Sequence, residues 1–385
     1  MAVTTVQDNN KLVRYTREIN REFVRENMFS PYMGQDLNAI IRIRQELKQG
    51  GDQMNIPLVT KLRGRGTGTG TLVGNEEKID NYGMRLWIDW ARHAVVTKKS
   101  ETHKDSADIF GEARPLLSDW GKERQRDDIV EAFMALPAEV APVGLGADEG
   151  NTVNGIKYEN ATTAQKNTWN ADNQDRVLYG SAVSNYNATH ATALGNIDTT
   201  DDKMSAKVVS LAKSQAELAD PAIKPYKTRD GYEYYVMFVG SNAFRDLKAD
   251  PTIVAANRDA RAREGNGMDK NPLFQDGDLI WDGVIIRKVP EISKYVTSVW
   301  TTLLTAGASS SRVEPYFLCG QQALVLGWGQ MAKPTFRKED DYGFITGVGT
   351  EMAYGVGKMF KRIQDGTAMK QWGVFTGFVS AASNA

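Results

Sequence analysis

The chain has 385 residues, 41% of them hydrophobic, and its 47 lysines and arginines nearly balance its 48 aspartates and glutamates. The formal net charge of −1 shows no excess of basic residues of the kind found in proteins dedicated to binding nucleic acid. The length predicts two or three structural units. Cys319 is the only cysteine, and no run of about 18 apolar residues occurs, so we expect no intrachain disulfide, no Cys-based metal site and no membrane span.

The first predicted element is an amphipathic helix over residues 11–28, with an apolar stripe that includes Phe23. A narrow stripe does not stabilise a lone helix, so this one needs a surface to lie on. Arginines recur along it at helical spacing, at Arg14, Arg17, Arg21 and Arg25. They could contact nucleic acid or an assembly partner, but nearby glutamates favour a salt-bridged solvent face. A second, short helix is predicted over residues 36–47.

A long hairpin is predicted next. Residues 55–62 and 82–96 are strand-like, and between them glycine alternates with arginine or threonine over residues 63–71. Glycine at alternate positions cannot pack a core. Two extended arms around such a tip predict a hairpin that reaches away from the body toward another molecule.

Residues 105–136 predict a long helical segment, in which Pro115 causes a kink or starts a fresh helix. Residues 138–200 are polar and rich in asparagine, so we expect either a surface insertion or a partly ordered excursion.

Residues 200–330 predict a mixed α+β body. A helix over 204–218, with Leu218 among its inward positions, precedes a strand over 232–239 and a helix that begins at Asp250-Pro251. Asp282-Gly283 between two apolar runs is a strong hairpin signal. The last 55 residues, rich in glycine and aromatics, read as several strands.

Signs of catalysis are weak. The glycine-rich stretch 64–74 could approach phosphate, but it lacks the closing Gly-Lys-Ser/Thr of a phosphate-binding loop. The three histidines His93, His103 and His190 form no recognisable metal motif, and Cys319 lies in an apolar run typical of a buried thiol. We therefore predict neither an enzyme nor a cofactor or metal site.

The order of these features resembles the major capsid proteins of tailed bacteriophages, which have the HK97-like fold. The likeness spans about residues 30 to 380 and is carried by short stretches at 72–77 (LVGNEE), 86–95 (LWIDWARHAV), 113–117 (ARPLL), 276–284 (DGDLIWDGV), 290–292 (PEI), 341–343 (DYG) and 355–358 (GVGK).

The resemblance implies an α+β fold divided into functional parts. These would be an N-terminal arm (1–53), an extended hairpin loop (54–97), a peripheral domain with a spine helix (98–137), a polar insertion (138–200), an axial domain (201–330) and the C-terminal strands of the peripheral domain (331–385).

The resemblance also implies a function. The chain would assemble with itself into hexamers and pentamers of an icosahedral head that encloses double-stranded DNA. Its other partners would be scaffolding, portal and decoration proteins, with non-specific DNA contact and no membrane. It would be assembled in the host bacterial cytoplasm and end in the virion capsid.

Two sets of residues are predicted to contact neighbouring subunits. In the extended loop they are Arg63, Arg65, Gly66, Gly68, Gly70, Glu76 and Glu77; in the N-terminal arm they are Arg14, Arg17, Arg21, Phe23 and Arg25. Two alternatives stay open: the shell protein of an encapsulin-type bacterial compartment, and a phosphate-binding enzyme that uses the Gly/Thr-rich loop.

Overall fold

The computed structural model describes residues 25, 27–59, 61–62, 64–79, 81–104, 109–228, 231–256, 274–275, 278–337, 341–363 and 368–383. The chain divides into two compact units. Unit 1 comprises Met1–Asn27, Arg92–Gln125 and Ala332–Met352; unit 2 comprises Met28–Ala91, Arg126–Met331 and Ala353–Ala385. The predicted helix over 11–28 lies almost wholly outside the described residues.

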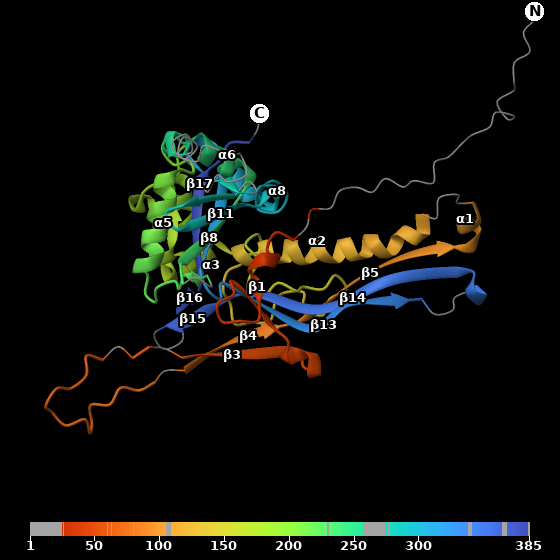
Figure 1. Cartoon of the computed structure of the whole chain (residues 1–385), viewed down its shortest axis with the longest axis horizontal. Coiled ribbons are helices and arrows are strands. Elements are labelled where there is room, and N and C mark those ends of the chain that lie inside the picture. The colour runs from red at the N-terminus through yellow and green to blue at the C-terminus, as the bar shows by residue number, and fades with distance from the viewer. Residues whose placement is uncertain are drawn as a thin grey trace, which may run out of the picture. The chain divides into compact units, whose positions relative to one another are not determined.

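Unit 1 packs one helix against a sheet. Helix α2 (Ala113–Met134) contributes its first half, and the strands follow the order β13 (Leu324–Phe336), β14 (Ile345–Lys358), β5 (Asp89–Lys98). In this unit α2 lies along the strands (Figure 1), where the Trp120 and His93 ring centroids are 5.0 Å apart. The Arg114 guanidinium lies 5.0 Å from the Phe336 ring centroid. The short helices of unit 1 are α1 (Lys99–Lys104), η4 (Ile109–Glu112) and η10 (Asp341–Gly343).

Pro115 is the third residue of α2, which follows directly on η4. The first four N–H groups of a helix have no partner within it, so proline at this position removes no helical hydrogen bond. The prediction that Pro115 starts a fresh helix is confirmed.

Unit 2 is built on a mixed sheet with the strand order β6-β17-β12-β8-β11-β10-β9, and β7 pairs with β8. Their bounds are β6 (Val177–Tyr179), β17 (Val374–Ser380), β12 (Val313–Cys319), β8 (Glu233–Val239), β11 (Val284–Lys288), β10 (Asp278–Trp281), β9 (Phe274–Gln275) and β7 (Tyr226–Lys227). Every residue of β12 and β17 is buried, so these two central strands form the middle of the core.

Unit 2 also contains several helices. They are α3 (Thr163–Asp172), α4 (His190–Gly195), α5 (Ala206–Leu218), α6 (Ser241–Ala249) and α8 (Pro290–Ser298), with the shorter η5 (Gln174–Arg176), η6 (Val183–Asn185), η8 (Thr301–Thr305) and η9 (Ala308–Ser310). Val208, Val209 and Ala212 of α5 lie in the main apolar core, whereas Leu218 is 82% exposed. The prediction of an inward Leu218 is wrong because the apolar stripe of α5 ends before its last residue.

Local signals account for several of these elements. Trp281 pairs with Val284 across Asp282 and Gly283, which have φ values of 49° and 71°. Two positive φ values define the type I′ turn that joins right-twisted strands, so the predicted hairpin is confirmed. Residues 251–256 are helical, and the Asp250 carboxylate accepts a hydrogen bond from the Thr252 N–H at 2.8 Å. The rest of that predicted helix lies outside the described residues.

The predicted helix over 36–47 is wrong. This segment forms strand β2 (Ile41–Arg44), which runs parallel to β1 (Met33–Gly34) and to β13, and then η3 (Glu46–Gln49). The sequence Ile-Arg-Ile-Arg alternates with the period of a strand. Its pairing partners begin at Leu324, far along the chain, so no local signal announces them. The 3-10 turn η2 (Ser30–Tyr32) precedes β1.

Part of the segment 151–200 is buried in unit 2, which differs from the surface insertion or partly ordered excursion that the sequence predicted. Strand β6 pairs with β17, and Asn154 is buried. The Asn154 side chain accepts a hydrogen bond from the Trp87 N–H at 2.9 Å and donates one to the Trp87 carbonyl at 2.8 Å. Asparagine here substitutes for a backbone partner, so an asparagine-rich sequence does not mean a solvated one.

His190 lies in a buried cage of aromatic rings in the same segment. The Tyr179 hydroxyl donates to Asn170 Oδ1 at 2.9 Å and lies 2.7 Å from His190 Nδ1, while the Tyr158 hydroxyl lies 3.0 Å from Nε2. Because Tyr179 directs its proton to Asn170, His190 Nδ1 donates and Nε2 accepts. Burial, assisted by Lys166, lowers the pKa of His190 to about 3.

Lys358, at the end of β14, is also buried, and its Nζ has no hydrogen-bond partner among the described residues. The nearest aromatic face is that of Trp169, 6.0 Å from Nζ to the ring centroid. Burial lowers the pKa of Lys358 to about 7, and the Cys319 thiol opposes this shift.

We expect His190 to make the protein sensitive to acid. In the unfolded chain its pKa is about 6.5, so the unfolded state binds an extra proton between about pH 6.5 and pH 3. The free energy of unfolding should fall across that window by several kcal/mol, on the order of 4, and should not depend on this group above it. Urea unfolding of His190→Gln should show less pH dependence below pH 6, while the exposed control His103→Gln keeps the wild-type profile.

Lys358 should destabilise the protein at neutral and acidic pH. Its unfolded pKa is about 10.4, so the penalty for burying it is full below about pH 7 and disappears as the pH rises through 10.4. Lys358→Met should therefore raise the free energy of unfolding by a few kcal/mol, about 2–4, at pH 6 and by much less at pH 10. An equal gain at both pH values would contradict a charged-lysine penalty.

Candidate assembly surfaces

The hairpin predicted from the sequence is formed by β3 (Gln53–Val59) and β4 (Asn81–Trp87). The strands pair antiparallel over their whole length, from Gln53 opposite Trp87 to Val59 opposite Asn81. Its root is packed on unit 2 by an apolar cluster comprising Ile56, Met84, Leu86, Val325, Met359 and Phe360. Strands β15 (Phe360–Ile363) and β16 (Ala368–Gln371) form a second small hairpin, and β15 lies next to β4.

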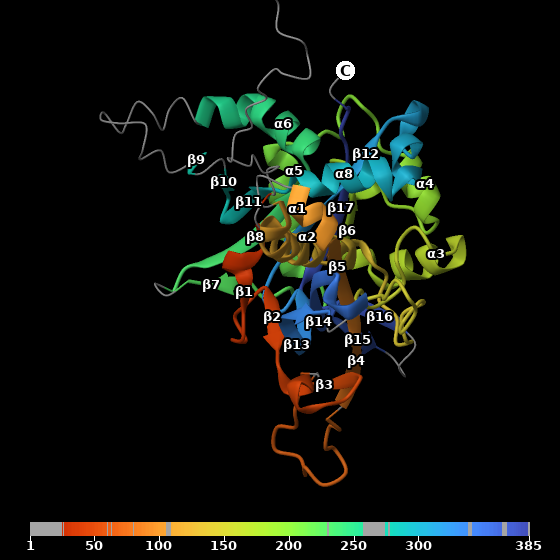
Figure 2. The same ribbon diagram turned by 90° about the vertical axis from the view of Figure 1, so that its right-hand side faces the viewer.

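Beyond the root, the chain between β3 and β4 extends away from the sheets of unit 2, as Figure 1 and Figure 2 both show. Gly66 and Gly74 have φ values of 74° and 86°, which side chains rarely adopt. A Cβ added at Gly66 or Gly68 would meet no atom within 4 Å. Two carboxylates support the tip: Glu77 accepts from the Gly64 N–H at 2.6 Å, and Glu76 accepts from the Gly74 N–H at 2.7 Å.

Large apolar side chains stand in water along this loop. Their exposed fractions range from 60% to 80%, and they are Val59, Leu62, Leu72, Val73 and Ile79. Single exposed apolar residues are ordinary, but several on one projecting loop indicate a surface that another molecule covers.

The predicted loop residues come together on this tip. Arg65, Gly66, Gly68, Gly70, Glu76 and Glu77 are all exposed there, and Arg63 lies outside the described residues. The sequence analysis did not predict the exposed apolar residues of the loop. The one sequence signal for them is Leu72-Val73, which directly follows the Gly/Thr run. The contact role of all these residues stays a prediction.

The predicted arm residues Arg14, Arg17, Arg21 and Phe23 lie outside the described residues. Arg25 is among the residues that the structure describes, and its side chain is half-buried.

The residues considered for catalysis occupy separate places. His93 lies against Trp120 with the two rings tilted, and His190 lies in the aromatic cage. Burial raises the pKa of the Cys319 thiol well above its usual value. Within the described ranges no three His, Cys, Asp or Glu side chains cluster as a metal site. The Gly/Thr-rich loop leads into strand β4, whereas a phosphate-binding loop leads into a helix. None of the described helices is long and apolar enough to cross a membrane.

Comparison with known proteins identifies the class. The family model for phage capsid protein matches residues 3–384. The capsid asymmetric unit of cyanophage Pam1 contains a chain 35% identical in sequence, with full coverage of both chains and a TM-score of 0.85. The capsid of Ralstonia phage GP4 gives 18% identity and a TM-score of 0.70 over 100% of this chain and 99% of that one. The head of Helicobacter pylori bacteriophage KHP40 gives 14% identity and a TM-score of 0.62, covering 97% and 96%. No curated protein matches the sequence.

The chain thus has the α+β, HK97-like fold of phage capsid subunits, which confirms the fold class expected from the sequence. It belongs to the phage capsid protein family, and its role is that of a structural protein of the virion shell.

We predict that a charge at Val73 impairs assembly without destabilising the subunit. Val73 is 80% exposed, so Val73→Asp should leave the unfolding temperature of the free subunit unchanged. If the side chain is buried between subunits, losing it costs ~1–3 kcal/mol per contact and raises the protein concentration needed for assembly by roughly tenfold or more. Light scattering across a concentration series measures this shift. Val73→Ile, which keeps the apolar surface, is the matched control and should assemble like the wild type.

Proposed function

We propose that this chain is the major capsid protein of a tailed bacteriophage and that it assembles into the hexamers and pentamers of an icosahedral head around double-stranded DNA. The observation that carries the proposal is the family match over nearly the whole chain. The Pam1 chain, from a phage capsid, supports it by matching end to end at 35% identity.

We propose the following structural roles for the parts of the chain. The hairpin of residues 54–97 lies on a neighbouring subunit, through tip residues such as Arg65 and Glu77, and the arm of residues 1–53 makes a second contact. Residues 98–137 and 331–385 form the peripheral domain, and residues 201–330 form the axial domain near the capsomer axis. The exposed apolar loop supports this arrangement, because a lone subunit leaves that surface in water.

We also propose that the protein is not an enzyme, that scaffolding, portal and decoration proteins are its partners, and that assembly takes place in the host bacterial cytoplasm. Contact with packaged DNA would be non-specific. Membership in a phage capsid family favours the DNA-filled head over the encapsulin-type compartment. The loop that leads into a strand weighs against a phosphate-binding enzyme.

The direct test is sedimentation and negative-stain microscopy of the purified, untagged chain, with and without its scaffold. Closed shells, or rings of five and six subunits, are the expected result. A monomer under every condition would overturn the proposal.

Nucleotide titration of the same sample is the companion measurement. We expect no binding to the wild type, and therefore no difference from Gly66→Ala/Gly68→Ala. Saturable nucleotide binding that this double variant abolishes would instead support the enzyme.

A further inference from the structure

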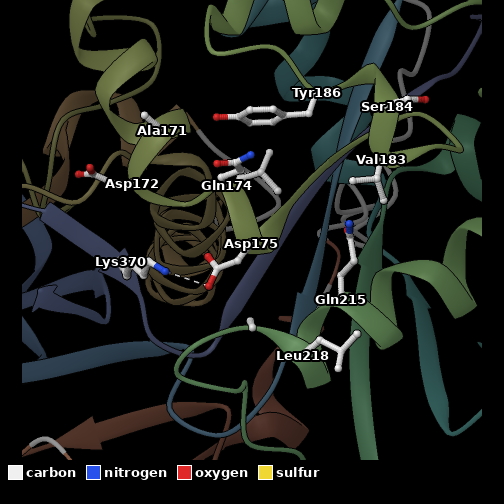
Figure 3. Close-up of a pocket in the computed structure, with 12 residues that line it drawn as sticks. Ala171, Asp172, Gln174, Asp175, Val183, Ser184, Tyr186, Gln215, Leu218 and Lys370 are labelled. Atoms are coloured by element: carbon white, nitrogen blue, oxygen red, sulfur yellow. Dashed lines mark hydrogen bonds and ion pairs between the residues drawn. The ribbon is translucent and has the colours of Figure 1, made fainter. Parts of the chain in front are cut away.

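A groove of about 550 Å³ opens on unit 2 and has no role so far. Its wall is assembled from the ends of α3 and α5, from η5, β6 and η6, and from Lys370 of β16 (Figure 3). The elements from α3 to η6 are consecutive in the sequence, whereas α5 and Lys370 join them only in the folded unit.

Two apolar side chains are exposed on the rim of the groove. Leu218, the last residue of α5, is 82% exposed, and Val183 of η6 is 54% exposed. Deeper in the groove lie Val177 and Ala219, which are buried. An exposed leucine and valine on either side of a hollow form a surface that gains free energy when another apolar surface fills it.

The Asp175 carboxylate in the groove is bonded within the subunit. The Asp175 carboxylate accepts hydrogen bonds from Lys370 Nζ at 2.9 Å, from Arg176 Nε at 3.1 Å and from the Asp220 N–H at 3.0 Å. Burial alone would raise the pKa of Asp175, but the Arg176 and Lys370 hydrogen bonds lower it to about 2. Figure 3 shows Lys370 reaching Asp175 across this side of the groove. An ionic ligand would have to break these bonds, so the groove suits a largely apolar protein surface.

One end of the groove lies next to the base of the hairpin loop. Asp220 directly follows the groove residues Leu218 and Ala219, and its carboxylate lies 3.6 Å from Lys61 Nζ at the base of the loop. Beside Lys61 in the sequence stand Val59 and Leu62, both 60% exposed. This ion pair brings the base of the loop, with its exposed Val59 and Leu62, close to the end of the groove at Leu218 and Ala219.

We propose that this groove is a subunit–subunit contact, filled in the shell by the neighbouring copy of this chain that the hairpin also covers. The inference rests on the proposed assembly, and it adds a further contact to those of the hairpin and arm. Different patches of two identical copies would meet here, and head-to-tail contacts of this kind close into rings.

A cysteine footprint tests the groove directly, because Cys319 is fully buried and is the only native cysteine. The variant Leu218→Cys places a thiol on the rim. In free subunits a maleimide should label it rapidly, and in shells assembled from this chain alone the rate should fall by about tenfold or more. The wild type sets the background, and urea-unfolded samples set full labelling.

The outcomes separate this inference from the proposed function. Shells of the Leu218→Cys variant in which the introduced thiol reacts as fast as in free subunits would overturn the groove contact and leave the shell function intact. Protection that appears only after another phage protein is added would also overturn it, because the occupant would not be a second copy. Failure of the wild type to form any shell would instead count against the proposed function.

A second variant pair checks the energetics. Leu218→Asp should keep the unfolding temperature of the subunit, because the side chain is exposed, and should reduce shell yield by about tenfold. Leu218→Met should assemble like the wild type. Normal assembly of Leu218→Asp would contradict the proposal.

Discussion

The burial of the hairpin root on unit 2 is the interaction on which the assembly surface depends. Ile56, Met84 and Leu86 pack against Val325, Met359 and Phe360, and this fixes where β3 and β4 leave the body. Beyond that cluster no described residue covers the tip of the loop, so Leu72 and Val73 remain exposed in this part of the structure. A rigid root with an uncovered tip favours binding to a neighbour, since little conformational entropy is lost when the root is already ordered.

Each contact between subunits of a shell can be weak when taken singly. A shell repeats each contact between many identical subunits, so modest interfaces add up to a stable particle. A net charge of −1 suits such packing because repulsion between identical subunits does not accumulate. The salt bridge between Lys61 and Asp220 is exposed and contributes little stability, on the order of 0–1 kcal/mol, but it marks where the loop and the groove adjoin.

Buried polar groups set the internal geometry of unit 2. Asn154 bonds both backbone groups of Trp87, and Arg176, fully buried, donates to the carbonyls of Gln371 and Pro221. Each of these side chains would be costly to leave unsatisfied, so each admits few alternative packings. Lys358 is one exception, since its Nζ lacks a hydrogen-bond partner among the described residues and its burial lowers stability near neutral pH.

The sequence alone determined the elements whose causes are local. Pro115 set the start of α2, Asp282-Gly283 set the type I′ hairpin, and the Gly/Thr run between two strand-like arms set the extended loop. The exposed arginine, glycine and glutamate residues of the loop followed from the same local pattern, whereas its exposed apolar residues did not.

Tertiary structure decided what depends on distant partners. Ile41–Arg44 became a strand because Leu324 and its neighbours lie beside it, and the asparagine-rich segment was buried because Trp87 and Val356 offer backbone groups to Asn154. The groove has no sequence signature, since Leu218, Val183 and Lys370 are far apart along the chain and become neighbours only when the sheet of unit 2 forms. Hydrogen-bond partners and apolar neighbours supplied from far along the chain carry no local periodicity, which is why these features appear only in the folded protein.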